Sequence, residues 1–184
     1  HEMGMGGFFM HARVGLDTPY LSKEWFACVR ACVDEAEKLG MRAWIYDEDR
    51  WSSGAAGGLV TKKNRFRMRR LHLILTASPA DLVWTRTTVA AFIADIEGFS
   101  ARNVRRITTG YRPLKLRAGE RILMFTEETE SLSNWYNGFT YLDTMNPAAV
   151  REFIKVTHEA YHRHEGRRFG STIPGIFTDE PNHG

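Results

Sequence analysis

Residues 6–51 read GGFFMHARVGLDTPYLSKEWFACVRACVDEAEKLGMRAWIYDEDRW. The run 6–11 is apolar and ends in polar residues, which predicts a buried strand. Apolar residues then recur at steps of three and four over 25–39, behind Ser22 as a favourable N-cap, and predict an amphipathic helix. Residues 42–46 predict a second buried strand. Strand, helix and strand with short connections form a βαβ unit, so the two strands are expected to be parallel.

The same rhythm returns near the end of the sequence. Residues 139–143 (FTYLD) predict a strand that ends in a carboxylate. Asn146 is placed to cap a helix that begins at Pro147, because proline is favoured in the first helical position. Residues 173–178 (IPGIFT) predict a last buried strand.

The middle of the chain has a different pattern. The runs LHLILTA (71–77), TTVAAFIADI (87–96) and RILMFTEET (121–129) are β-like and lie between basic, turn-like stretches. No strong helix separates the later runs, which predicts an antiparallel β insertion. The sequence therefore predicts three segments: 1–58 and 131–184 with the βα rhythm, and 59–130 as the insertion.

The composition excludes several classes of protein. The chain has 184 residues, 43% of them hydrophobic and 26% charged, which is typical of a globular domain and not of a disordered one. The net charge of +3 is mild, and no recognised nucleic-acid motif accompanies it, so no nucleic-acid partner is expected. The apolar runs are too short to cross a membrane, so no membrane partner is expected either.

Polar side chains gather where the predicted parallel strands end. The carboxyl end of a parallel sheet is where α/β proteins place their active sites. We therefore expect these side chains to lie together at one rim of the sheet. In chain order they are His11, Arg13, Asp47, Glu48, Asp49, Asp143, Asn146, Asp179 and Glu180.

A rim rich in acids with aromatic neighbours suits carbohydrate chemistry. Cleavage of a glycosidic bond needs one carboxylic acid to protonate the leaving oxygen and a second carboxylate to activate water or attack the sugar. Further acids can hold sugar hydroxyls or Ca²⁺, which prefers oxygen ligands. Trp51 and Trp135 lie in loops, where their rings can face a sugar.

Four long motifs carry a family resemblance. GGFFMHARVGLDTPYLSKEWF (6–26), GMRAWIYDEDRWSSGAAGG (40–58), WYNGFTYLDTMNPAAVREFIKVTHEAYHRHEGRRFG (135–170) and IPGIFTDEP (173–181) resemble glycoside hydrolase family 106, the bacterial α-L-rhamnosidase family. Order and spacing match over most of the chain, and the stretch 71–119 is only loosely similar. The best-understood members of this family are calcium-dependent, inverting enzymes.

The resemblance implies an α/β fold built as part of a TIM (β/α)8-type barrel, with about four parallel strands and the antiparallel β subdomain inserted. A whole barrel needs about 250 residues, so the chain is expected to be a fragment of the catalytic barrel. The implied partners are the remaining half of the barrel, accessory β domains and a rhamnose-containing glycan or related glycoside. The resemblance also implies an exported parent protein and possible use of calcium as cofactor.

The resemblance also assigns roles to residues. Glu180 in TDEP matches the strand-end position of the general acid, and a partner base is expected from a later strand outside this chain. Asp179 would orient it or bind substrate. The other matched residues would contact the sugar: His11, Arg13, Asp47, Asp49, Trp51, Asp143 and Asn146. Family members often carry Gly at position 50 and Pro at 52, where this chain has Arg50 and Ser52.

Two alternatives remain open. His158-Glu159-Ala160-Tyr161-His162 matches H-E-x-x-H, in which two histidines on one helix face bind Zn²⁺ and the glutamate acts as base. This motif predicts a zinc metallopeptidase, although both histidines fall beside the apolar stripe of the helix. The other alternative is a non-catalytic fragment that acts only within a larger assembly.

Overall fold

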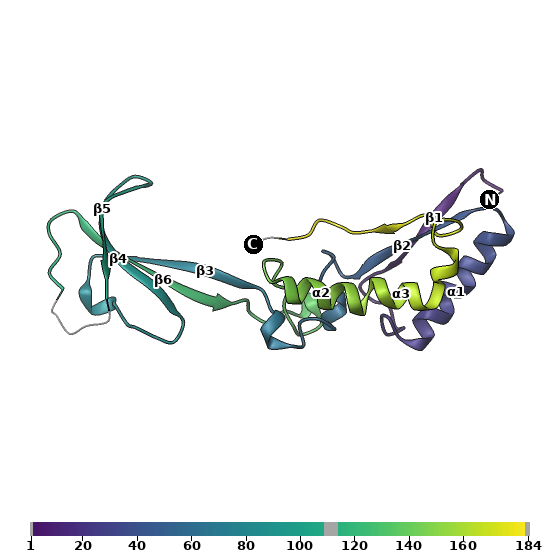
Figure 1. Cartoon of the computed structure of the whole chain (residues 1–184), viewed down its shortest axis with the longest axis horizontal. Coiled ribbons are helices and arrows are strands. Elements are labelled where there is room, and N and C mark those ends of the chain that lie inside the picture. The colour runs from purple at the N-terminus through teal and green to yellow at the C-terminus, as the bar shows by residue number, and fades with distance from the viewer. Residues whose placement is uncertain (1, 109–113, 183–184) are drawn as a thin grey trace. The chain divides into compact units, whose positions relative to one another are not determined.

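The chain folds into two compact units. The computed structural model describes residues 2–108 and 114–182. Unit 1 comprises His1–Met68 and Glu130–Gly184, and unit 2 is Arg69–Thr129. Each unit has a sheet of its own (Figure 1).

Unit 1 contains a parallel sheet with the strand order β1-β2-β7. The strands are β1 (Gly7–Ala12), β2 (Arg42–Asp49) and the short β7 (Ile176–Phe177). Helix α1 (Lys23–Lys38) connects β1 and β2, and the Ser22 hydroxyl accepts the Trp25 amide N–H at 3.1 Å. The βαβ unit and the N-cap predicted from the sequence are therefore confirmed.

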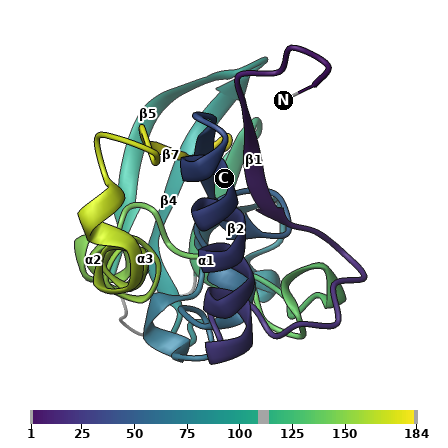
Figure 2. The same ribbon diagram turned by 90° about the vertical axis from the view of Figure 1, so that its right-hand side faces the viewer.

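Helix α1 packs on one face of the sheet (Figure 2). Alternation along the strands decides which side chains meet the helix. Residues 43 and 45 of β2 point to the helix, and Ala43 and Ile45 are fully buried there with Val33 of α1. Residues 44, 46 and 48 point to the opposite face, because successive strand side chains alternate. The two faces of β2 therefore carry different chemistry.

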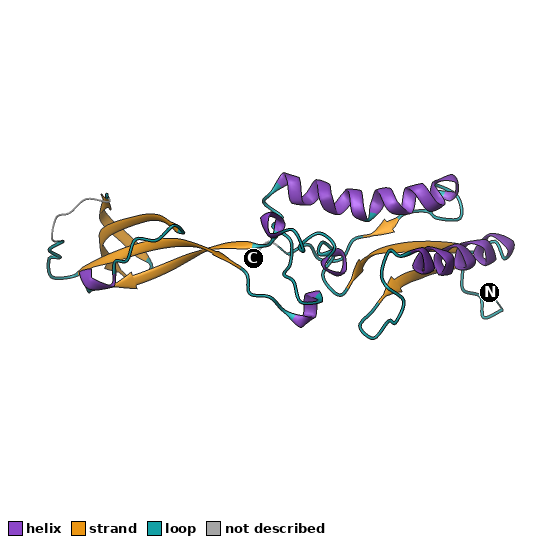
Figure 3. Cartoon of the chain, turned by 90° about the horizontal axis from the view of Figure 1, so that it is seen from below, coloured by secondary structure: helices purple, strands orange, loops and turns teal. Residues whose placement is uncertain are grey.

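Two consecutive helices follow the return of the chain to unit 1. They are α2 (Pro147–Val156) and α3 (His158–Glu165), which run on from each other in Figure 3. Thr157 separates them with φ −104° and ψ −80°, and its hydroxyl donates to the Phe153 carbonyl at 2.5 Å. Asn146 Oδ1 accepts the Ala148 N–H at 3.0 Å, which confirms the predicted cap.

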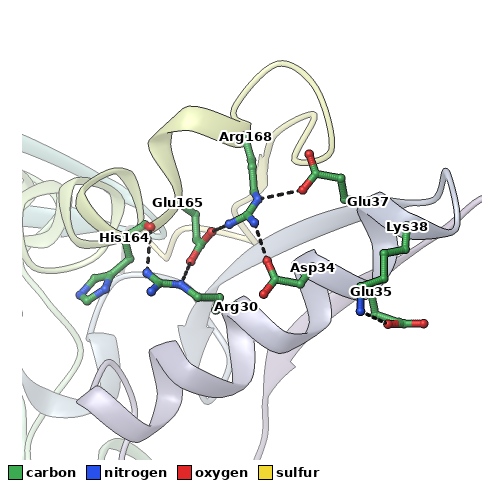
Figure 4. A network of polar contacts seen from close by, with 8 residues as sticks. All are labelled: Arg30, Asp34, Glu35, Glu37, Lys38, His164, Glu165 and Arg168. Atoms are coloured by element: carbon green, nitrogen blue, oxygen red, sulfur yellow. Dashed lines mark hydrogen bonds and ion pairs between the residues drawn. The ribbon is translucent and has the colours of Figure 1, made fainter.

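A network of charges ties α1 to the end of α3 (Figure 4). The Glu165 side chain is fully buried, and its two oxygens accept from Arg30 Nε at 3.1 Å and from an Arg168 terminal nitrogen at 2.7 Å. Arg168 also pairs with Asp34 and Glu37 of α1. These contacts of one buried carboxyl group hold α1 and the end of α3 together.

Unit 2 is a four-stranded antiparallel sheet with the order β3-β6-β4-β5. Its strands are β3 (Arg69–Thr76), β4 (Thr88–Glu97), β5 (Ser100–Ile107) and β6 (Glu120–Thr129). Its core contains Ile93, Ile122 and Met124. Short 3₁₀ turns complete both units: η1 (Ala56–Gly58), η2 (Asn64–Phe66), η3 (Pro79–Asp81), η4 (Asn134–Tyr136) and η5 (Gly166–Arg168).

The prediction of a partial TIM (β/α)8-type barrel is wrong. The described residues contain three parallel strands instead of about four, and strands and helices do not alternate as a barrel requires. Residues 139–143 form only isolated antiparallel bridges, Ser133 with Phe139 and Arg67 with Leu142. The backbone of these residues forms hydrogen bonds with the segment before β3: the Tyr141 carbonyl accepts from Met68 N–H, and the Asp143 N–H donates to the Phe66 carbonyl.

Among the described residues, none of the helices has the length and apolar character that a membrane span requires.

Candidate functional site

A buried glutamate lies at the carboxyl end of β2. Glu48 is 1% exposed, and its Oε1 lies 2.6 Å from Nε2 of His11. The parallel register of β1 and β2 brings them together, with Met10 opposite Ile45 and a bulge before Ala12. Glu48 Oε2 has no hydrogen-bond partner among the described residues. Burial without full pairing disfavours the charged carboxylate.

The protonation of this pair follows from its surroundings. Burial raises the pKa of Glu48 to about 7, the negative charge of Asp179 adds to the rise, and the cation of Arg13 opposes it. Burial, helped by Arg13, lowers the pKa of His11. The contact between the two side chains therefore carries a single shared proton near neutral pH.

Tyr46 and Asp179 flank the pair. The Tyr46 hydroxyl donates to Asp179 Oδ2 at 2.5 Å, and its ring stacks on His11 at 3.6 Å between centroids. Burial and the bond to Asp179 raise the pKa of Tyr46, so it remains a phenol. Two backbone contacts hold Asp179: its N–H donates to Ser53 Oγ at 2.9 Å, and its carbonyl accepts the Ser53 N–H at 3.0 Å. We call His11, Tyr46, Glu48 and Asp179 the acid cluster.

Aromatic rings continue the same sheet face beside the acid cluster. Phe9 lies 5.7 Å from Trp44 and 5.7 Å from Phe177 between ring centroids, and Tyr46 lies 4.8 Å from Phe177. Phe9 and Phe177 are 52% and 42% exposed. Aromatic side chains that pack a core are usually buried further than this. The face therefore offers apolar ring surface next to a proton donor.

A polar pocket of about 300 Å³ has in its lining Arg13, the cation whose charge acts on the pKa values of Glu48 and His11. Arg13 lines it together with Asp49, Arg50 and Asn137. Asn137 Nδ2 donates to Asp49 Oδ2 at 3.1 Å, and Arg50 Nε donates to Asn137 Oδ1 at 2.9 Å. A Cβ at Gly57 would lie 2.6 Å from Asp49 Oδ2. Only glycine therefore lets the backbone at position 57 approach the Asp49 carboxyl group this closely.

Two of the predicted sugar contacts, Trp51 and Asp47, have other partners. Trp51 is 46% exposed, and its carbonyl accepts the indole N–H of Trp135. Asp47 is fully buried, and its Oδ2 accepts from His158 Nε2 and from the Thr178 hydroxyl, each at 2.7 Å. It precedes Glu48 in β2 and points to the other face of the sheet, away from the acid cluster.

The remaining predicted residues contact backbone or solvent. Asp143 Oδ1 accepts the Met145 N–H at 3.1 Å, and Asn146 donates from Nδ2 to the Arg65 carbonyl at 3.2 Å besides capping α2. Glu180 is exposed, with φ +35°, on the segment that follows β7. The roles predicted for these three residues stay predictions.

The H-E-x-x-H histidines have separate surroundings. His158 is bonded to Asp47, and His162 is exposed with its ring 5.7 Å from that of Phe169. Within residues 2–108 and 114–182, no group of three or more His, Cys, Asp or Glu side chains is placed to hold a metal ion.

Glu48 and Tyr46 are the residues that sequence reasoning undervalued. Both lie in the β2 segment whose strand end was singled out, but the family resemblance assigned sugar contacts to Asp47 and Asp49 and no role to Glu48. The alternation of β2 was the available signal, because it places Tyr46 and Glu48 together on the face away from α1.

Comparison of the chain with protein-family models, with curated proteins and with solved structures finds no match.

Proposed function

We propose that this chain carries the proton-donating part of a glycoside-hydrolase site, with Glu48 as general acid. The observation that supports this most is the buried Glu48 carboxyl, whose pKa is raised to about 7. A carboxylic acid that keeps its proton near neutral pH can give it to a leaving oxygen, which an ordinary exposed glutamate cannot do efficiently.

The surroundings of Glu48 favour a sugar as substrate. The exposed rings of Phe9 and Phe177 offer apolar surface to a pyranose face, and the pocket of Arg13 and Asp49 offers donors and acceptors to hydroxyl groups. The motif resemblance to α-L-rhamnosidases narrows the proposal to a rhamnoside or related glycoside. Export of the parent protein and calcium as a cofactor belong to the same proposal, and both rest on the resemblance alone.

The proposed reaction balances with two carboxyl groups. Glu48 donates its proton to the glycosidic oxygen as the bond to the anomeric carbon breaks, and water forms the new bond to that carbon. A carboxylate takes the proton of that water, and the resemblance places this base on a later strand outside this chain. His11 holds the Glu48 carboxyl in place through its hydrogen bond. When Glu48 is protonated again after the reaction, the proton lies between these two side chains. In an inverting enzyme, the two carboxyl groups stand roughly 6.5–9.5 Å apart.

The test is Glu48→Gln in the full-length protein. Hydrolysis of an alkyl rhamnoside, whose leaving group needs protonation, is expected to fall roughly 10²–10⁴-fold, the usual contribution of a general acid. Hydrolysis of an aryl rhamnoside with an acidic leaving group should fall much less, because that group departs without a proton.

Two matched variants sharpen the result. Glu159→Gln makes the same chemical change at an exposed glutamate of α3 and should leave both rates unchanged. Loss of a peptidase activity in that variant would favour the zinc alternative instead. Glu180→Gln tests the motif-based assignment directly: if it abolishes alkyl rhamnoside hydrolysis while Glu48→Gln does not, Glu180 is the acid and the role given to Glu48 is wrong.

A further inference from the structure

A second pocket lies in unit 1 next to the Asp47–His158 pair. Its volume is about 310 Å³. The apolar part of its lining consists of Leu142, Val150, Phe153, Ile154 and Pro181. Small-molecule sites have this character, with mostly apolar walls and a few polar groups that fix orientation, and this volume is at the small end of their range.

His158 and Tyr141 are the titratable side chains in this lining, and the Tyr141 hydroxyl already donates to the Ser53 carbonyl. The His158 side chain is 31% exposed, while the Asp47 side chain behind it is fully buried. A carboxylate only accepts hydrogen bonds, so the 2.7 Å contact places a hydrogen on His158 Nε2. In the neutral imidazole, Nδ1 is then an acceptor, and no partner for it is found in the part of the chain that the structure describes. Asp47 thus fixes both the tautomer and the ring, as a carboxylate behind a functional histidine does.

This pocket is distinct from the acid cluster. Asp47 and Glu48 are consecutive in β2 and point to opposite faces of the sheet, so the groups behind His158 and those around His11 do not share a surface. None of the four residues of the acid cluster lines the pocket.

We propose that this pocket binds a small apolar molecule that carries one hydroxyl group, of the phenol class. The ring occupies the space between Leu142, Val150 and Ile154, and the hydroxyl donates to His158 Nδ1. The apolar walls disfavour a charged ligand, because the ligand would lose its hydrogen bonds to water and gain none from the walls. The volume suits a single ring. The inference does not depend on glycoside hydrolysis.

Binding of 4-fluorophenol to the whole chain, followed by ¹⁹F NMR, tests the proposal. We expect the ¹⁹F signal to show saturable binding. In ¹H NMR of the histidine rings, the His158 signals should shift, and those of His164, which stacks on Phe26, should stay in place. Fluorobenzene, which lacks the hydroxyl, should bind about tenfold more weakly or worse, because one hydrogen bond to a fixed acceptor is lost.

Three variants locate the site. Val150→Phe fills the pocket and should abolish binding, whereas Lys155→Ala, at an exposed position of the same helix, should not change it. His158→Phe should remove the preference for 4-fluorophenol over fluorobenzene. His158→Phe can fail to fold, because it leaves Asp47 unpaired. In that case the proposal is tested by comparing 4-fluorophenol with fluorobenzene on the unmodified chain and by the binding measured in Val150→Phe.

Three outcomes would overturn the proposal: no saturable binding of 4-fluorophenol, equal affinity for fluorobenzene, or unchanged affinity in Val150→Phe.

Discussion

The two units each bury a glutamate at the end of a β-strand, and the two carboxyl groups behave in opposite ways. In unit 2, Glu120 is 5% exposed, and its oxygens accept from the Arg117 N–H at 2.7 Å and from Arg105 at 2.5 Å. The Arg117 N–H, together with the Arg105 guanidinium, lowers the pKa of Glu120. In unit 1, Glu48 is 1% exposed and has only His11, and its pKa rises.

The difference shows that burial alone does not set the state of a carboxyl group. Where donors satisfy both oxygens, the charged form is favoured, and the group stabilises the fold as a fixed ion. Where one oxygen is left without a donor and another acid lies nearby, the proton stays on. Unit 2 thus favours the charged form of its buried glutamate, and unit 1 favours the protonated form of Glu48.

The largest effect expected from this contrast is on the stability of unit 1. The pKa of Glu48 is about 7 in the folded protein and has its ordinary value of 4.5 in the unfolded chain. Between pH 4.5 and 7 the Glu48 carboxyl therefore ionises in the unfolded chain but not in the folded one, which lowers the free energy of unfolding. This decrease appears as the pH rises through 4.5 to 7 and amounts to about 3 kcal/mol at pH 8. Glu48→Gln should therefore raise the free energy of unfolding at pH 8 by up to that amount and hardly change it at pH 4.

Urea unfolding followed by tryptophan fluorescence measures this change. Four of the five tryptophans, Trp25, Trp44, Trp51 and Trp135, belong to unit 1, so the signal reports mainly on that unit. Equal stability of Glu48→Gln and the unmodified protein at pH 8 would mean that Glu48 is ionised without cost, and the contrast with Glu120 would disappear.

In unit 2, Glu120→Gln should lower the stability. This change is smaller than the one expected for Glu48→Gln in unit 1 and opposite in sign. The folded pKa of Glu120 is depressed, so its contribution to stability is present above the unfolded value of 4.5 and is lost as the pH falls through the folded value. Glu120→Gln should therefore destabilise unit 2 at pH 7. Hydrogen exchange of the β6 amides at that pH should be faster in the variant, and slower exchange would contradict the role given to the pair with Arg105.

Local patterns allowed part of the fold to be predicted. Ser22 and Asn146 were recognisable as caps, because each side chain bonds to an amide two or three residues ahead. The barrel prediction failed at residues 139–143, whose apolar pattern is that of a strand. The backbone of these residues bonds to Phe66, Met68 and Glu130, and no local pattern indicates those partners.

The candidate site could also be predicted only in part, because its properties depend on residues that are far apart in the sequence. The sequence indicates that acids follow the strand ends, but the pKa of Glu48 depends on burial and on the charges of Asp179 and Arg13, which are 131 and 35 residues away. The side-chain partner of Asp47 is His158, 111 residues away. Alternation along β2 separates Asp47 from Glu48, and the register of β1, β2 and β7 decides which residues of the other strands lie beside each of them.

The smallest predicted effects separate the neighbours of Glu48. Asp179→Asn removes a negative charge and should lower the pKa of Glu48, whereas Arg13→Ala removes a cation and should raise it. Each shift should be smaller than the rise caused by burial, which is the largest cause. ¹³C NMR titration of the glutamate carboxyl carbons in both variants measures the shifts, and two shifts of the same sign would exclude this electrostatic account.

The same titration of the unmodified protein tests the central claim most directly. Glutamates labelled with ¹³C at the carboxyl carbon, with Glu48→Gln used to assign the signal, should show Glu48 titrating with a pKa of about 7 while Glu120 titrates below 4.5. A Glu48 midpoint near 4.5 would show that no proton is held there at neutral pH, and the proposed general acid would be lost with it.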